Sequence, residues 1–267
     1  MIAGIPVPNP IKPRIFELMD PVLRISTRAS RIEIIASTII RFIEEGGIAV
    51  GIDIVPERLA DLENELTSKG LSVKTVAGDL MADSTIDAAL AAAGPRVDVL
   101  INNAGIMDDF VPIDELDDEL WDRVIGVNVT SVMKLSRAIV KLMLKAGKGS
   151  IVTIASAASF KSGIAGSAYV SSKHAVTGLV KSMATLYGPK GIRSNAVAPG
   201  AVSTNIMDQT KVPRGAATMQ ALGVNMANMG TVGQSEQLAA AILFLASDDA
   251  SYVNGVVMPV DGGWVAR

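Results

Sequence analysis

From about residue 30 onward, short apolar runs alternate with longer segments in which apolar residues recur at helical spacing. We expect the runs to be buried strands and the longer segments to be amphipathic helices. The expected strands lie within residues 47–53, 71–79, 97–105, 149–156, 192–200 and 255–263. The expected helices lie within residues 30–45, 56–70, 84–94, 118–147, 168–188 and 235–247. Strands that are apolar throughout and are separated by helices indicate a parallel sheet covered on both faces.

The size of the chain favours one domain around one core. The chain has 267 residues, of which 49% are hydrophobic, and no repeat or low-complexity linker divides it. Residues 1–20 contain four prolines and are expected to form an irregular arm, so the domain should span residues 21–267. In a sheet of this kind ligands bind beyond the carboxyl ends of the strands. The loops after 97–102, 151–156 and 196–200 are therefore the candidate site.

Composition excludes several classes of function. Lys and Arg total 24 against 27 Asp and Glu, and the basic residues are scattered, which argues against a nucleic-acid partner. The chain has no Cys and a single His, so a thiolate nucleophile is excluded and a protein metal site is not expected. No apolar run reaches the roughly 18 residues of a membrane span, and the N-terminus resembles no targeting peptide. We expect a cytoplasmic protein with no membrane association, acting on a small molecule.

Four polar residues are candidates for chemistry. Tyr169 and Lys173 are four positions apart in an expected helix, so their side chains lie on one face. An ammonium beside a phenol favours the phenolate, and a tyrosine with a lowered pKa can exchange a proton with a substrate oxygen. Ser156 ends the preceding expected strand, and Asn128 is polar within an apolar stretch. Alone, the Tyr-x-x-x-Lys spacing is weak evidence, because it is common on solvated helix faces.

Several motifs together are far more specific than this pair. They are "NNAG" at 102–105, "GVN" ending at Asn128, Ser156, "YVSSK" at 169–173, "NAVAPGAVST" at 195–204 and "VDGG" at 260–263. In this order and spacing the chain resembles the short-chain dehydrogenase/reductase family over residues 21–267, most strongly after Gly47. The resemblance implies a single-domain Rossmann fold of α/β class, with a doubly wound, mostly parallel, seven-stranded sheet and helices on both faces. It also implies a homotetramer formed through the long helices.

The family resemblance implies roles for particular residues. Tyr169 would be the general acid and base, and Lys173 would lower its pKa and bind the nicotinamide ribose. Ser156 would orient the substrate carbonyl, and Asn128 would hold a water that relays protons. The remaining residues would contact the cofactor: Asp79 and Leu80 at the adenine, Asn103, Ala104 and Gly105 on the adenosine side, and Pro199, Gly200, Val202 and Thr204 at the nicotinamide. The implied reaction interconverts a secondary alcohol and a ketone, as 3-oxoacyl reductases and small-alcohol dehydrogenases do.

Asp53 favours NAD(H) over NADP(H). A carboxylate at the end of the second strand accepts hydrogen bonds from the ribose hydroxyls and repels a 2′-phosphate. Arg28 and Arg31 argue the other way, because a basic residue in the phosphate turn can serve a 2′-phosphate. We rank Asp53 higher, since its place at the end of a strand is clearer.

The stretch "RISTRASRIEIIAS", residues 24–37, lacks the glycines of the family's phosphate turn, Thr-Gly-x-x-x-Gly-x-Gly. Counted back from Asp53, the three glycine places fall on Ala29, Glu33 and Ile35; matched from Ser26, they fall on Thr27, Arg31 and Glu33. Glycines there permit a tight turn and close approach of pyrophosphate, which a Glu33 or Ile35 side chain would obstruct.

Three interpretations of this stretch stay open. The chain is an active NAD(H)-dependent oxidoreductase that contacts phosphate differently, with Arg28 or Arg31 as counter-charge. Alternatively, it is an impaired relative that acts as a binding or scaffold subunit. In the third interpretation, residues 1 to about 45 are not the native reading of this region.

Other noticeable residues have simpler explanations. His174 is expected to be structural, because it points away from the face of Lys173. The acidic residues of 114–122 are expected to begin a solvated helix. Four methionines, at positions 207, 219, 226 and 229, form either an apolar lid over the substrate or adaptable packing.

Overall fold

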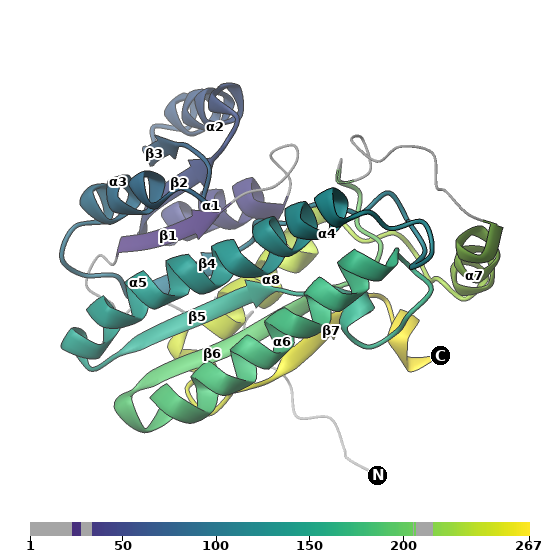
Figure 1. Ribbon diagram of the computed structural model, residues 1–267. Helices are drawn as coiled ribbons and strands as arrows, with labels where there is room; N and C mark the ends of the chain where they lie inside the picture. Colours follow the sequence, from purple (N-terminus) through teal and green to yellow (C-terminus); the bar gives the residue numbers. More distant parts are fainter. Residues whose placement is uncertain (1–22, 28–33, 205, 207–215) are drawn as a thin grey trace, which may run out of the picture.

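The computed structural model describes residues 23–27, 34–204, 206 and 216–267 (Figure 1). Its strands are β1 (Leu23–Thr27), β2 (Ile48–Asp53), β3 (Lys74–Ala77), β4 (Val99–Asn102), β5 (Gly149–Ile154), β6 (Ile192–Pro199) and β7 (Val257–Val260). Its α-helices are α1 (Ile34–Glu44), α2 (Pro56–Ser68), α3 (Asp83–Ala93), α4 (Asp118–Ile125), α5 (Ser131–Ala146), α6 (Ser167–Tyr187), α7 (Ala216–Ala227) and α8 (Ser235–Ala246). The arm expected over residues 1–20 lies outside the described residues.

All seven described strands form one sheet in the order β3-β2-β1-β4-β5-β6-β7, and every neighbouring pair is parallel. Strands β1 to β3 are added toward one edge of the sheet and strands β4 to β7 toward the other, so the strand order reverses between β1 and β4. There Ile25 lies opposite Leu100. At such a reversal the loops after the two strands leave toward opposite faces and open a crevice at the carboxyl edge. The predicted doubly wound, seven-stranded Rossmann fold is confirmed.

Helices cover both faces of the sheet (Figure 1). On one face α3 and α5 pack against the strands, as when Ile139 joins the cluster around Leu100. On the other face α1 and α8 do so, as when Ile242 joins the cluster around Ile101. Adjacent residues of β4 therefore enter opposite cores, which explains why the strands are apolar runs. None of the helices in the described ranges is both long and apolar enough to cross a membrane.

The helix expected over residues 118–147 begins at Asp118 and ends at Ala146 but is interrupted. Its start is capped by Asp117, whose Oδ1 accepts a 2.7 Å hydrogen bond from the backbone N–H of Leu120. Between α4 and α5 the residues Gly126–Thr130 form a π-helical turn. A π-turn inserts one residue into the helix and is frequent at functional sites. The turn contains Asn128, which is buried.

Candidate active site

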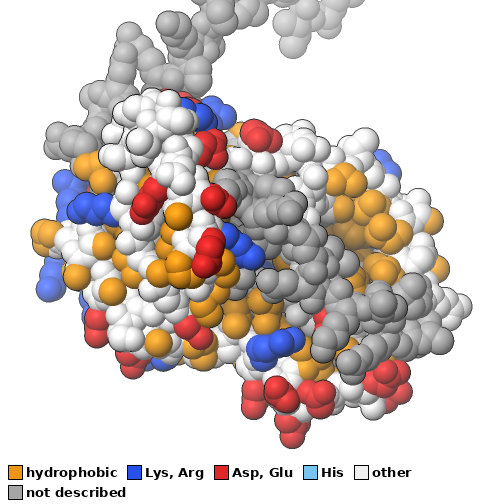
Figure 2. Space-filling model, turned by 90° about the horizontal axis from the view of Figure 1, so that it is seen from above, with side chains coloured by type: hydrophobic (Ala, Val, Ile, Leu, Met, Phe, Trp, Pro, Cys, Tyr) orange, Lys and Arg blue, Asp and Glu red, His pale blue; other side chains and the backbone are white. Residues whose placement is uncertain are grey.

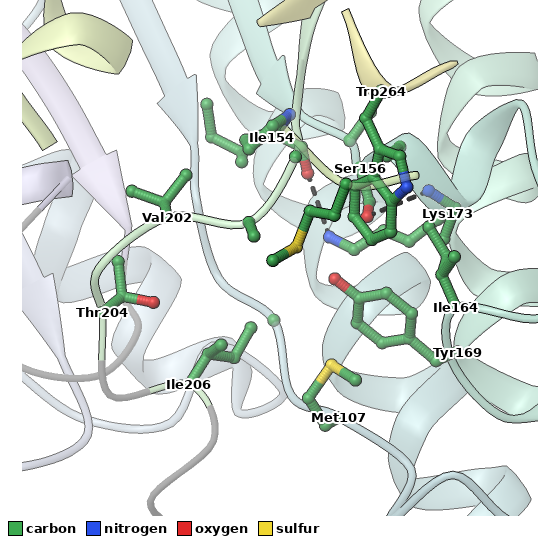
Figure 3. Close-up of a pocket in the computed structure, with 18 of the residues that line it drawn as sticks. Met107, Ile154, Ser156, Ile164, Tyr169, Lys173, Val202, Thr204, Ile206 and Trp264 are labelled. Carbon is green, nitrogen blue, oxygen red and sulfur yellow. Dashed lines mark hydrogen bonds between the residues drawn. The ribbon is translucent and has the colours of Figure 1, made fainter. Parts of the chain in front are cut away.

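The loops after β4, β5 and β6 enclose a cavity of about 410 Å³ at the carboxyl edge of the sheet. Figure 3 shows Ser156, Tyr169 and Lys173 on one side of it, with Val202 and Thr204 opposite. The cavity lies where the sequence predicted a site. Its size is in the range of pockets that hold small organic ligands.

Tyr169 and Lys173 occupy successive turns of α6, and both are buried. The Nζ atom of Lys173 lies 5.5 Å from the centroid of the Tyr169 ring and donates a 3.0 Å hydrogen bond to the carbonyl of Ile154. The side chains of Ser156 and Tyr169 line the same side of the cavity (Figure 3). Ser156 Oγ accepts a 3.1 Å bond from the N–H of Ala158, which fixes its orientation. The three residues predicted to act together are thus adjacent.

The lowered pKa expected for Tyr169 is not found in the protein alone, and the effect of Lys173 on it stays a prediction. Burial raises the pKa of Tyr169 to about 12; the nearby hydroxyl of Ser156 opposes this shift, and the charge of Asp108 adds to it. Burial also lowers the pKa of Lys173 to about 8. Both groups are cut off from water, and loss of hydration disfavours their charged forms. At neutral pH the phenol therefore carries its proton.

Asn128 connects the loop after β4 to α6. Its Oδ1 accepts a 2.8 Å hydrogen bond from the N–H of Ile106, and its Nδ2 donates to the carbonyl of the same residue at 3.0 Å. The Nδ2 atom also donates to Ser172 Oγ at 2.9 Å, and Ser172 Oγ donates to the carbonyl of Tyr169 at 2.7 Å. The side chain of Asn128 therefore holds protein groups in place, and the water-relay role stays a prediction.

Asp108 is fully buried and caps the N-terminus of α6. Its Oδ1 accepts hydrogen bonds from the N–H groups of Gly166 at 3.0 Å and Phe110 at 3.2 Å, and its Oδ2 accepts one from Tyr169 at 2.8 Å. Burial raises the pKa of Asp108, and the three backbone donors oppose that shift. Sequence reasoning missed this residue, because a cap 58 positions from its helix leaves no local pattern.

The backbone around Asp108 is strained and tightly packed. Asp109 and Phe110 have φ angles of 55° and 57°, which non-glycine residues rarely adopt. A Cβ atom on Gly166 would lie 2.5 Å from both Asp108 Oδ2 and the N atom of Val111. Strained residues of this kind persist where the surrounding contacts fix them, and they cluster at functional sites. Only glycine lets α6 begin this close to the loop.

Asp53 lies at the end of β2 as predicted, and it is 7% exposed. Its Oδ1 accepts a 2.8 Å hydrogen bond from the N–H of Val55, and Nη1 of Arg58 lies 3.8 Å from the same oxygen. Arg58 lies in the first turn of α2 and was not identified from the sequence. A carboxylate and a guanidinium therefore stand together where the ribose of a dinucleotide is expected.

The other predicted cofactor residues lie in loops along the carboxyl edge. Asp79 and Leu80 follow β3, where Asp79 accepts a 2.9 Å hydrogen bond from the N–H of Met81 and Leu80 is buried in the core. Asn103, Ala104 and Gly105 follow β4; Pro199 ends β6, and Gly200, Val202 and Thr204 follow it. All of these β4 and β6 residues except Ala104 line the cavity.

The described part of the crevice fits a dinucleotide. A Cβ atom on Gly105 would lie 3.3 Å from Lys173 Nζ, so the glycine leaves open the space above the ammonium. Asp53 supplies an acceptor at the outer end, and Ile34, at the start of α1, lines the cavity. Ile35 packs against two apolar clusters, so it belongs to the core. Residues 28–33, with Arg28, Ala29, Arg31 and Glu33, lie outside the described residues.

The four methionines and His174, which the sequence analysis also considered, differ in their relation to the cavity. Met226 and Met229 line the cavity, whereas Met207 and the side chain of Met219 lie outside the described residues. His174 is exposed, and its Nδ1 lies 2.9 Å from the carbonyl of Val170 on the same helix. It does not line the cavity, as expected.

Comparison with known proteins gives consistent matches along the chain. A family model described as enoyl-(acyl carrier protein) reductase matches residues 33–265. The chain is 37% identical to 3β-hydroxysteroid dehydrogenase 2 of Eggerthella lenta over 235 residues, which cover 86% of this chain and 90% of that protein.

Solved structures match with the same fold. Levodione reductase superposes with a TM-score of 0.82 at 30% identity, covering 92% of this chain and 98% of the other. A gluconate 5-dehydrogenase of Burkholderia cenocepacia, in complex with NADP and tartrate, superposes with a TM-score of 0.81 at 28% identity, covering 95% and 98%.

Proposed function

Since the chain belongs to the short-chain dehydrogenase/reductase family and is an oxidoreductase of CH–OH groups, we propose that Tyr169 is the acid and base of alcohol–ketone interconversion. The observation that carries the proposal is that the hydroxyls of Ser156 and Tyr169 line the same side of the cavity, with the ammonium of Lys173 5.5 Å from the centroid of the Tyr169 ring. A bound nicotinamide dinucleotide would supply or accept the hydride.

In this proposal Tyr169 exchanges a proton with the substrate oxygen and Ser156 binds that oxygen. With a pKa of about 12, the phenol of Tyr169 is protonated at neutral pH and can donate its proton to a ketone oxygen as the carbon is reduced. In the reverse direction the alcohol O–H gives its proton to the phenolate. The hydroxyl of Ser156, oriented by the N–H of Ala158, holds the same oxygen. This pair places the proton donor and the substrate oxygen within one hydrogen bond of each other.

Lys173 and Asn128 support this exchange. The ammonium of Lys173 lies under the space that Gly105 leaves open, where it can bind the hydroxyls of a ribose. We propose that proton transfer from Tyr169 to solvent passes Lys173 and a water held near Asn128. The π-helical turn brings Asn128 to the loop after β4, which is the position that this path requires.

We propose NAD(H) as the preferred dinucleotide. The carboxylate of Asp53 can accept hydrogen bonds from the ribose hydroxyls and repels a 2′-phosphate. Arg58, at 3.8 Å from Asp53, is the described residue that favours NADP(H), and the gluconate 5-dehydrogenase structure binds NADP. We rank Asp53 above Arg58 because its buried carboxylate lies at the end of β2, where it would repel a 2′-phosphate.

Titration with NADH and NADPH tests the proposal. Saturable binding of NADH, measured by protein fluorescence and melting temperature, and turnover of a secondary alcohol with NAD⁺ are the expected results. No shift with either dinucleotide at millimolar concentration would favour the second candidate function, a binding or scaffold subunit. The sequence feature behind that candidate is the absence of glycine from residues 26–35.

We also propose a homotetramer. Trp121 on α4 and Leu144 on α5 are 38% and 37% exposed, and large apolar side chains on adjacent helices are common at subunit interfaces. Light scattering of the purified protein measures its mass directly, and a monomer would contradict this proposal.

A further inference from the structure

The cavity beside Tyr169 is walled mainly by apolar side chains (Figure 3). Those that are not among the predicted cofactor-binding residues include Met107, Phe110, Ile164, Leu222, Met226 and Trp264. Lys173 is the one charged residue among the described residues that line it. Figure 2 shows hydrophobic side chains gathered in a hollow on the side of the molecule where α7 lies. The wall therefore offers few partners for polar groups of a substrate.

Trp264 and α7 are held so that this wall stays apolar. The indole Nε1 of Trp264 donates a 3.0 Å hydrogen bond to the carbonyl of Asn225, so the polar atom of the ring is engaged and the ring surface faces the cavity. Asn225 Nδ2 in turn donates to the carbonyl of Gly163 at 3.1 Å. A Cβ atom on Gly163 would lie 2.8 Å from that Nδ2 atom, so glycine permits the close approach. These contacts seat α7 on the loop before α6.

Lys173 is poorly placed to hold a substrate carboxylate. Its Nζ atom donates to the carbonyl of Ile154 at 3.0 Å and lies beneath Gly105, on the side of the proposed cofactor. An anionic substrate inside this cavity would bury a carboxylate without a described counter-charge, and several additional hydroxyls would lose water with few partners to replace it. Sugar acids carry both kinds of group.

We propose that the substrate is a neutral, bulky and mainly apolar alcohol or ketone, such as a fused-ring alicyclic compound, whose one reacting oxygen lies between Ser156 and Tyr169. The inference rests on the proposed function of these two residues. The mouth of the cavity supports it, because Met226 and Val232 are 46% and 49% exposed there. A large apolar substrate covers this surface, which favours its binding.

Oxidation of three alcohols, each with NAD⁺ and NADP⁺, tests the proposal: epiandrosterone, cyclohexanol and gluconate. We expect kcat/KM for the steroid to exceed that for gluconate by about 100-fold or more, with cyclohexanol between them. Gluconate oxidised as efficiently as the steroid would overturn the apolar assignment. Cyclohexanol oxidised as efficiently as the steroid would overturn the requirement for bulk.

Binding without turnover separates this proposal from the proposed function. In a Trp121→Phe variant the remaining tryptophan is Trp264, whose fluorescence reports on the cavity. Saturable quenching by epiandrosterone and none by gluconate supports the substrate class even if no alcohol is oxidised, in which case the proposed function alone fails. Saturable quenching by gluconate and none by the steroid would overturn the substrate class.

A pair of variants on α7 tests whether the apolar substrate contacts Met226. Met226 lines the cavity, whereas Val224 on the same helix is 63% exposed and does not. Met226→Glu is expected to lower kcat/KM for the steroid by about tenfold or more, because a carboxylate would face an apolar ligand. Val224→Glu is expected to change it by less than about twofold. Equal losses in the two variants would contradict an apolar substrate contact at Met226.

Discussion

Asp108 Oδ2 accepts a 2.8 Å hydrogen bond from the backbone N–H of Tyr169, so the loop after β4 caps the helix that carries the proposed acid. Its Oδ1 accepts the N–H of Gly166 at 3.0 Å in the same cap. The charge of Asp108 also raises the pKa of Tyr169. One buried carboxylate therefore helps to position Tyr169 and adds to the rise in its pKa, of which burial is the largest cause.

The first prediction concerns Asp108→Asn. An amide supplies only one acceptor oxygen, so the variant leaves a buried N–H without a partner and is expected to lose about 1 to 3 kcal/mol of unfolding free energy. Loss of the negative charge lowers the pKa of Tyr169, so the pH profile of alcohol oxidation should move to lower pH. Asp117→Asn is the matched control, because Asp117 caps α4 through Leu120 and does not contact Tyr169. If the pH profile of Asp108→Asn does not move, the prediction that the charge of Asp108 raises the pKa of Tyr169 is contradicted.

The second prediction compares two glycines of the α6 region. A Cβ atom on Gly166 would lie 2.5 Å from Asp108 Oδ2, whereas one on Gly178 would meet nothing within 4 Å. Gly166→Ala is expected to lower the unfolding free energy by about 1 to 3 kcal/mol, as overpacking does. Gly178→Ala should raise it by about 0.5 to 1 kcal/mol, since alanine favours the helix. Urea unfolding measures both changes. An unchanged unfolding free energy in Gly166→Ala would show that the cap accommodates a Cβ atom, contrary to this prediction.

The third prediction concerns the buried ammonium of Lys173. Burial lowers its pKa from 10.5 to about 8, so below pH 8 the folded protein holds a desolvated charge that the unfolded chain solvates. That shift corresponds to roughly 3 kcal/mol of destabilisation at neutral pH. Lys173→Met is therefore expected to raise the melting temperature at pH 7 while abolishing turnover. Loss of the hydrogen bond to Ile154 offsets a smaller part of this gain in stability.

The sign of this effect with pH is fixed by the lowered pKa. As the pH rises from about 8 to 10.5, the folded protein loses the proton first, so wild type gains stability that Lys173→Met cannot gain. The difference in melting temperature between the two proteins should therefore shrink toward about pH 10. A difference that stays constant between pH 7 and pH 10 would mean that Lys173 carries no burial cost.

The fourth prediction concerns the choice of dinucleotide. Asp53→Ser removes the charge that repels a 2′-phosphate and leaves the guanidinium of Arg58 available to it. The ratio of kcat/KM for NADP⁺ to that for NAD⁺ should rise by about tenfold or more. Adding Arg58→Leu should reverse most of this gain, whereas Lys69→Leu, at the far end of α2, should not. A ratio unaffected by Asp53→Ser would remove Asp53 from cofactor selection.

Much of the fold could be predicted from the sequence, because the central strands β4, β5 and β6 are buried on both faces and read as apolar runs. Leu100 and Ile101 illustrate this, since they enter cores on opposite sides of the sheet. The π-turn at Gly126–Thr130 could not be predicted from periodicity, because one inserted residue leaves the apolar spacing nearly helical. Lys173 and Tyr169 were placed correctly on one face of α6.

The protonation states and the cap could not be predicted from spacing. Adjacency of Tyr169 and Lys173 suggested mutual stabilisation of charge, whereas the structure buries both groups and desolvation dominates. Asp108 and Trp264 reach the site through tertiary contacts, the first 58 positions from Gly166 and the second 39 positions from Asn225. Such contacts depend on how distant segments pack, which local patterns do not encode.

The most direct test of the central claim is the rate of alcohol oxidation by Tyr169→Phe, followed by the absorbance of the reduced nicotinamide. The variant should bind the dinucleotide as wild type does and lose about 100-fold or more in kcat, because the phenol no longer exchanges the proton. Tyr187→Phe, at the other end of α6, should keep the wild-type rate. Retention of more than about a tenth of the wild-type kcat by Tyr169→Phe would contradict the assignment of Tyr169 as the acid and base.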